Sequence, residues 1–343
     1  MANPDLQAAA SAGTLRQLPP SAFTAAALSA RNASGNTAMH AAAKNGGLPD
    51  LPPAVITAEL LSLRNDAGYT PLHHAAVGGH LDQVPAGFLT REALLSRSNA
   101  GYTVFHSAAA NGSLGQLPAN LLPADVFELR TEVGNSVLHE AAENGALDRV
   151  RPQMITAKSM ACQNLAGETV IHTAAFNGHL DQIPRNLLTA ESLAQKTSSG
   201  DTVFHAAAIS GHLGQIPGEL FAHESLVASS KSGFTPIHAA AETGQLDRIP
   251  RALLTADLLL TRNDSGDTPL HAAAFAGHLD QIPPELLTGD RLACRNYERV
   301  TVLQTAIDRG FADQLPEQFR PKPQGALRRF LSRIGGMRLP FSR

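Results

Sequence analysis

Histidine is the residue type in this chain with the widest scope for chemistry, and it occurs 14 times among 343 residues. An imidazole can ligate a metal ion or transfer a proton near neutral pH. Eight of the 14 recur at intervals of 33 residues: His40, His73, His106, His139, His172, His205, His238 and His271. If each lies on its own helix in a stack, neighbouring rings are about 8 to 10 Å apart, whereas two imidazoles sharing a zinc ion must each approach it to about 2 Å. We therefore expect no metal site and no cofactor along this series.

The other residues that could take part in chemistry recur at the same 33-residue interval. Cys162 and Cys294 occupy one position four intervals apart, which is about 32 to 40 Å in a straight stack, and a disulfide needs Cα atoms within about 7 Å. Two separate reduced thiols are expected.

The recurring acids are expected at the first turn of a helix: Asp82, Asp148, Asp181, Asp247, Asp280 and Asp313. Four more histidines follow a recurring glycine and are expected at a solvated surface: His80, His179, His212 and His278. Because the sequence also lacks G-x-S-x-G, H-E-x-x-H, Walker-type and dinucleotide-binding motifs, we predict no catalytic residues.

The interval itself is the strongest feature of the sequence. Segments such as GYTPLHHAAVGGHL and GDTPLHAAAFAGHL begin at glycines spaced by 33 residues without insertion: Gly35, Gly68, Gly101, Gly134, Gly167, Gly200, Gly233 and Gly266. A fixed period of this length is typical of a solenoid, in which each unit buries its apolar face against its neighbours. We predict eight full repeats over residues 35–298, with diverged capping units at 2–34 and 299–320.

Each repeat carries signals for where its helices begin and end. A Thr such as Thr70 suits an N-cap, Pro71 suits the first helical position, and Gly79 suits a left-handed residue that ends the helix. A second segment, L-D-Q-I-P-x-x-L-L-T-x-x-x-L-L, contains a recurring proline that would cost about 3 kcal/mol inside a helix. We therefore predict a short helical turn before the proline, a short helix capped by the recurring Thr, and a turn at the R-N-x-x-G stretch.

The block G-x-T-P-L-H-x-A-A-x-x-G-H-L at this period closely resembles the ankyrin repeat, over residues 2–320. The resemblance implies an all-α solenoid of stacked helix pairs, histidines that tie adjacent loops together, a concave groove that binds proteins, and no enzymatic activity. The second half of each repeat departs from the family, because a proline interrupts the second helix and L-T-x-E-x-L-L replaces the usual turn before a projecting hairpin. The shape of the finger region is therefore left open.

A partner is expected to contact the positions at which the repeats differ. In the ankyrin pattern the residue after the opening glycine lies near the finger, and the residue four after the histidine lies on the groove side of the helix. Six apolar or aromatic residues at these two positions are the predicted partner-binding residues: Tyr69, Tyr102, Phe176, Ile209, Phe234 and Phe275. The alternative is that these side chains pack against neighbouring loops.

Charge is divided unevenly along the chain. From Gln318 to the end there are seven Lys or Arg and no acid, which leaves 20 bases against 30 acids before it. Within this tail, residues 321–343, Leu327, Phe330, Leu331 and Ile334 have the spacing of a short amphipathic helix. Arg328, Arg329 and Arg333 are its predicted docking residues. The tail would cover the last repeat, dock on an anionic membrane or nucleic acid, or serve as a signal for a partner.

The sequence therefore favours a non-catalytic scaffold or adaptor that binds a protein partner on the concave surface of the solenoid. The alternative is a targeting or effector protein that acts through its basic tail. With two cysteines, no apolar run near the roughly 18 residues of a membrane span and no secretory pattern at the start, a cytoplasmic monomer is expected. Export by another kind of signal stays open.

Overall fold

The computed structural model describes residues 5–321. The chain divides into two compact parts: unit 1 ends at Ala206, and unit 2 begins at Ala207. The first-half helices of the repeats begin 33 residues apart from α3 onward: α1 Leu6–Ala12, α3 Ala38–Lys44, α5 Pro71–Gly78, α7 Val104–Ala110, α8 Val137–Glu143, α10 Val170–Asn177, α12 Val203–Ser210, α14 Pro236–Thr243, α16 Pro269–Ala276 and α18 Val302–Arg309. We call these the inner helices. The fold is an all-α repeat solenoid, as the sequence predicts.

The second half of each repeat is broken into short pieces on either side of the proline position. One three-residue 3-10 helix precedes it: Leu15–Gln17, Leu48–Asp50, Leu81–Gln83, Leu114–Gln116, Leu147–Arg149, Leu180–Gln182, Leu213–Gln215, Leu246–Arg248, Leu279–Gln281 and Ala312–Gln314. Another follows it: Pro20–Ala22, Pro53–Val55, Ala86–Phe88, Ala119–Leu121, Pro152–Met154, Arg185–Leu187, Gly218–Leu220, Arg251–Leu253, Pro284–Leu286 and Glu317–Phe319. The predicted interruption of the second helix is confirmed.

A short outer helix then closes most repeats: α2 Ala25–Ser29, α4 Ala58–Ser62, α6 Arg91–Leu94, α9 Ala157–Met160, α11 Ala190–Leu193, α13 His223–Leu226, α15 Ala256–Leu259 and α17 Gly289–Leu292. The hydroxyls of Thr57, Thr90 and Thr255 accept amide hydrogens at these N-caps, as predicted. Pro123 replaces the Thr in one repeat, and there Ala124–Glu128 forms a 3-10 helix instead.

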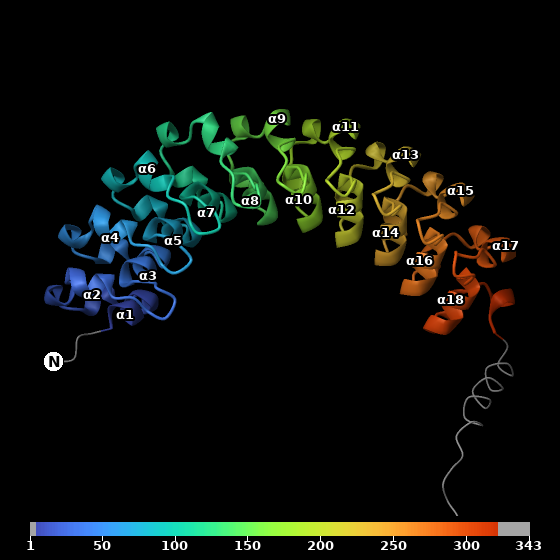
Figure 1. Ribbon diagram of the computed structural model, residues 1–343, viewed down its shortest axis with the longest axis horizontal. Coiled ribbons are helices and arrows are strands. Elements are labelled where there is room, and N and C mark those ends of the chain that lie inside the picture. The colour runs from blue at the N-terminus through green and yellow to red at the C-terminus, as the bar shows by residue number, and fades with distance from the viewer. Residues whose placement is uncertain (1–4, 322–343) are drawn as a thin grey trace, which may run out of the picture. The chain divides into compact units, whose positions relative to one another are not determined.

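Successive inner helices pack side by side in one row within each unit, and the outer helices form a second row beside it (Figure 1). In unit 1 the packing order runs from α1 through α3, α5, α7 and α8 to α10, and in unit 2 it runs from α14 through α16 to α18. Leu72, Ala75 and Ala76 of α5 are fully or almost fully buried between neighbours. None of the helices within residues 5–321 is long and apolar enough to cross a membrane.

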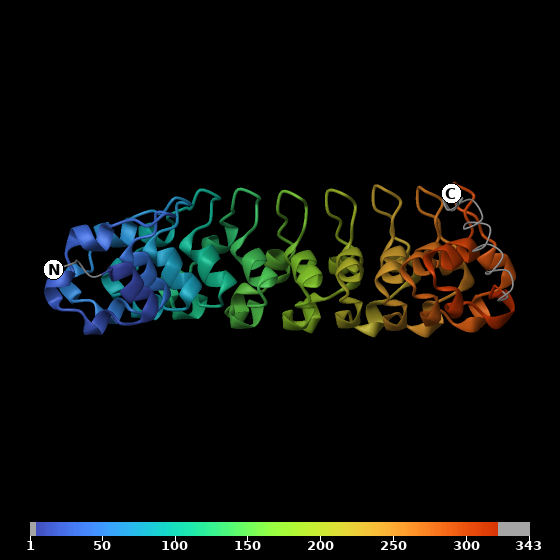
Figure 2. The same ribbon diagram turned by 90° about the horizontal axis from the view of Figure 1, so that it is seen from below.

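The loops between repeats are fingers that project from the same side of the helices in each unit (Figure 2). Each is a tight turn at the R-N-x-x-G stretch, as in the bonds from Asn65 N to Tyr69 O and from Gly68 N to Asn65 O, both 2.9 Å. Adjacent fingers are joined by single backbone bonds, such as Asn99 N to Ala67 O at 2.9 Å. The finger shape that the sequence left open is therefore a hairpin-like turn that pairs with its neighbour.

A glutamine at the third position of the first 3-10 helix in a repeat hydrogen-bonds to the backbone just beyond the end of the preceding inner helix. Gln116 accepts from Leu81 N at 2.9 Å and donates to Gly79 O at 2.6 Å. Gln182, Gln281 and Gln314 repeat this pair of bonds in other layers. No role was predicted for this glutamine from the sequence, although its recurrence was the available signal.

The histidines that follow the helix-ending glycine differ from expectation. His80, His179, His212 and His278 were predicted at a solvated surface, but all four are half-buried. The ring of His179 covers Gly145 of the preceding repeat so closely that a Cβ there would meet Cε1 at 2.7 Å, and His278 covers Gly244 in the same way. Packing on a residue of the preceding repeat removes these two rings from solvent.

Candidate interaction groove

The inner-helix histidines hydrogen-bond through their ring nitrogens, and His73 shows the pattern. His73 Nδ1 accepts the backbone N–H of Thr70 at 3.1 Å and lies 2.8 Å from its hydroxyl, so the ring proton is on Nε2. Nε2 donates to the carbonyl of Tyr102, in the next finger, at 3.1 Å. The Nε2 bond to the residue 29 positions onward recurs at His40, His106, His139, His172, His238 and His271. The expected tie between adjacent loops is confirmed at these residues.

Burial keeps these rings neutral. Removal from water lowers the pKa of His73 and of His106 to about 4, and it also lowers the pKa of His238 and of His271. A protonated ring would carry a hydrogen on Nδ1, which would oppose the Thr70 N–H in the case of His73. The described residues contain no group of three or more His, Cys, Asp or Glu placed to hold a metal ion. Cys162 and Cys294 are both free thiols, as predicted.

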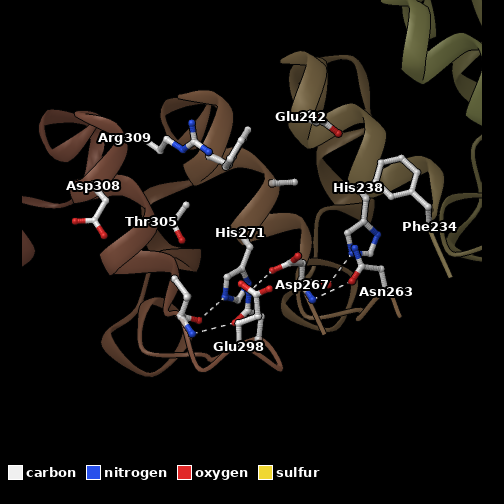
Figure 3. Close-up of a pocket in the computed structure, with 14 residues that line it drawn as sticks. Phe234, His238, Glu242, Asn263, Asp267, His271, Glu298, Thr305, Asp308 and Arg309 are labelled. Atoms are coloured by element: carbon white, nitrogen blue, oxygen red, sulfur yellow. Dashed lines mark hydrogen bonds between the residues drawn. The ribbon is translucent and has the colours of Figure 1, made fainter. Parts of the chain in front are cut away.

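A groove of about 440 Å³ lies on unit 2, between α14, α16, α18 and the adjoining fingers (Figure 3). The Phe234 ring lies against the His238 ring, with centroids 5.6 Å apart. The Phe275 side chain is 48% exposed, and the guanidinium carbon of Arg309 stands 3.5 Å from its ring centroid. We call this the unit 2 groove.

The unit 2 groove is acidic. Among its lining side chains are four acids, Glu242, Asp267, Glu298 and Asp308, and one cation, Arg309. Asn296 donates to Asp267 Oδ1 at 2.8 Å, and Gln304 donates to Asp308 Oδ1 at 2.6 Å. Because His238 and His271 are neutral, they do not offset this charge.

A comparison with known families agrees with the geometry. A family model described as ankyrin repeats (3 copies) matches residues 138–217 and again residues 218–283. The chain contains ankyrin repeats. Ankyrin repeats generally mediate protein–protein interaction, and proteins built from them are typically non-enzymatic scaffolds. None of the curated proteins compared matches this chain.

Unit 1 places its aromatic residues differently. Tyr69 and Tyr102 are half-buried, with ring centroids 6.5 Å apart, and each stands edge-on to a histidine of its own repeat, His73 or His106. The two tyrosines therefore already have packing partners, and their part in binding stays a prediction. Phe234 shares that position and that histidine contact in unit 2, but it also lines the groove.

A buried carboxyl group adjoins Tyr102. Glu140 of α8 is 3% exposed and accepts from Asn135 Nδ2 at 3.1 Å. Burial raises the pKa of Glu140 to about 7, with a smaller effect from Glu143, and burial raises the pKa of Tyr102 to about 12. Glu140 was not predicted from the sequence. Its signal was a charged residue directly after the histidine, where most ankyrin repeats of this chain have Ala, Ser or Thr.

The remaining predicted residues fall in separate places. Phe176 on α10 is 53% exposed in unit 1, and Ile209 on α12 is 47% exposed and belongs to unit 2. Phe234 and Phe275 are the two predicted partner-binding residues that line the unit 2 groove. The tail residues Arg328, Arg329 and Arg333 lie outside the described residues.

Proposed function

We propose that this chain is a non-catalytic adaptor whose ankyrin repeats hold a segment of a partner protein in the unit 2 groove. The observation that carries the proposal is the half-exposed Phe275 ring in a groove of about 440 Å³. Aromatic side chains in a pocket that loses its water on binding commonly dominate interface energies. His238 and His271 are the groove groups best suited to proton transfer. Both use their two ring nitrogens for hydrogen bonds to the N-cap Thr and to the next finger, which supports binding over catalysis.

The remaining predicted residues offer secondary contacts in this proposal. Phe176 and Ile209 present apolar surface at the same repeat position as Phe275. Tyr69 and Tyr102 are already packed on their histidines, so we assign them a smaller part. The array 2–320 is then the binding part of the chain, and the tail 321–343 is separate from it.

Affinity capture with the immobilised full chain tests the proposal. The variant Phe234→Ala/Phe275→Ala removes both groove rings, and each substitution leaves the inner-helix histidine bonds in place. The matched control is Val133→Ala/Leu165→Ala, which removes two exposed apolar side chains from finger tips of unit 1. We expect proteins captured by the wild type to be lost with the groove variant and kept with the control. Circular dichroism and urea unfolding establish that each variant is folded.

Unchanged capture by the folded groove variant would exclude the unit 2 groove as the binding surface. Adding Phe176→Ala or Tyr69→Ala/Tyr102→Ala then tells whether another part of the inner-helix face binds instead. Loss of capture with the finger-tip control would move the binding surface to the fingers.

A further inference from the structure

The four acids of the unit 2 groove are not neutralised by the part of the chain that the structure describes. Glu242, Glu298 and Asp308 are exposed and Asp267 is half-buried. None of the four forms an ion pair with a side chain among residues 5–321. These acids line a groove that also contains aromatic rings. Such a surface is complementary to a segment that carries both positive charge and apolar side chains.

The groove already holds one guanidinium. Arg309 lies over the Phe275 ring at 3.5 Å, a cation–π contact between two residues that line the groove. A planar guanidinium stacks on aromatic rings and pairs with carboxylates through its fork of N–H donors. Phe234, with Asp267 in the next finger, provides a second ring and acid in the same groove. Arginine is therefore the side chain that this surface suits best.

The chain carries an arginine-rich segment close to this groove in sequence. Residues 322–343 contain six Lys or Arg and no acid, together with Leu327, Phe330 and Leu331. The last described helix, Glu317–Phe319, closely follows α18, which supplies Thr305, Asp308 and Arg309 to the groove. An extended chain of 22 residues reaches about 70 to 80 Å, and three helix layers span about 30 Å. The segment is long enough to return across the whole groove.

We propose that the unit 2 groove binds the chain's own C-terminal segment, residues 322–343, through its arginines and apolar side chains. This inference rests on the proposed function, because it takes the same groove as a binding site and names its resident occupant. Tethering gives such a segment a local concentration of about a millimolar. An external partner must therefore displace it, and a basic, apolar segment is the kind of partner that can do so.

Limited trypsin digestion of the full chain tests the inference. A groove variant, E242Q/D267N/E298Q/D308N, removes the four charges with little change in shape. A matched control, D257N/D280N/D290N/D313N, makes the same change in net charge at four acids that do not line the groove. Mass spectrometry follows cleavage after Arg328, Arg329 and Arg333.

We expect these sites to be cut about 16-fold faster in the groove variant, since four charge pairs each contribute a factor of about two. The control should be cut at the wild-type rate, and added salt should raise the wild-type rate. Equal cleavage in all three proteins overturns the inference. A photo-reactive residue at Phe330 gives a second measurement: crosslinks to groove residues support the inference. Crosslinks to other parts of the chain, or only to anionic vesicles or RNA supplied in the sample, overturn it.

The same proteins separate failure of this inference from failure of the proposed function. If the tail occupies the groove, R328Q/R329Q/R333Q in the full chain should increase partner capture. If the groove protects the tail but Phe234→Ala/Phe275→Ala leaves capture unchanged, the inference holds and the proposed partner site is wrong. If capture depends on the two rings but the tail arginines are not protected, the proposed function holds and the inference is wrong.

Discussion

The inner-helix faces of units 1 and 2 share one set of histidine hydrogen bonds, which we call the frame, and they differ in the side chains that lie beside it. Both use a histidine bonded to its own Thr and to the next finger, as at His73 and His271. In unit 1, the residue after that histidine is large at Glu140, whose buried carboxyl group accepts from Asn135 Nδ2. In unit 2 that position is Ala239 or Ala272, and Ala272 lines the open groove. The two faces therefore differ in whether a buried carboxyl group or an open groove lies beside the shared histidines.

Lowering the pH should have the largest effect on stability, through the buried histidines of the inner helices. The folded-state pKa of His73 and of His106 is about 4, below the ordinary 6.5. As pH falls from 6.5 toward 4, the unfolded chain gains protons that the folded chain does not, so the free energy of unfolding falls. Each ring contributes on the order of 3 kcal/mol to this loss. Urea unfolding at a series of pH values measures it, and a constant free energy between pH 7 and 5 would contradict it.

Removing one histidine tests whether the two units use the same frame. His73→Ala leaves the Thr70 N–H without its acceptor and the Tyr102 carbonyl without its donor, and it opens a cavity. We expect a loss of about 3 kcal/mol, and the same loss for His271→Ala in unit 2. Hydrogen exchange should show the loosening only in the unit that carries the substitution.

The exposed His223 on α13 provides the control for both substitutions. His223→Ala should change stability by less than about 0.5 kcal/mol. A large loss at His73 with a negligible loss at His271 would show that the two units do not depend on the frame equally.

Glu140 should give unit 1 a pH dependence that unit 2 lacks. Its folded-state pKa of about 7 lies above the ordinary 4.5, so its contribution to stability is complete below pH 4.5 and is lost as pH rises through 7. Glu140→Gln keeps an acceptor for Asn135 and removes the charge. We expect this variant to be about 2 kcal/mol more stable than the wild type at pH 8, as measured by urea unfolding.

Glu143→Gln on the same helix is the matched control, because Glu143 is exposed. It should change stability by less than about 0.5 kcal/mol. Equal effects of the two variants would mean that overall acidity, and not burial beside Tyr102, sets the pH dependence. Repeating the acid series in the Glu140→Gln background isolates the histidine contribution, which has the opposite sign.

The helix ends were predictable because they depend on residues close together in the sequence. The side-chain contacts between repeats were not predictable, because they join residues far apart in the sequence. Thr70, Pro71 and Gly79 act within α5 and its caps, so their types alone located its ends. Gln116, by contrast, bonds to Leu81 and Gly79, which are 35 and 37 residues earlier, and the sequence does not state that register. The half-buried His179 and the filled position of Glu140 likewise depend on which neighbour lies opposite.

The candidate site was predictable to a similar extent. Repeat position identified Phe234 and Phe275, and the structure places both in one groove. Repeat position also selected Tyr69 and Tyr102, but it could not show that their rings stand on His73 and His106. Among the acids of the groove, Glu242 and Asp308 share the repeat position of Phe275, and Asp267 shares that of Phe234, but Glu298 lies at neither position.

The smallest expected difference concerns the finger turns. Unit 1 places glycines at the left-handed position of its fingers, such as Gly101 with φ +79°, whereas the last finger of unit 2 has Arg299 with φ +65°. A non-glycine residue there costs about 1 kcal/mol, partly offset because glycine makes the unfolded chain more flexible. Arg299→Gly should therefore stabilise unit 2 by about 0.5 kcal/mol, measured as a higher urea midpoint and slower hydrogen exchange in the last finger. Gly101→Ala is the opposite change in unit 1: a Cβ there would meet Glu132 N at 2.9 Å, so this variant should lose stability. If Arg299→Gly instead destabilises unit 2, the Arg299 side chain contributes more to the last finger than its backbone strain removes.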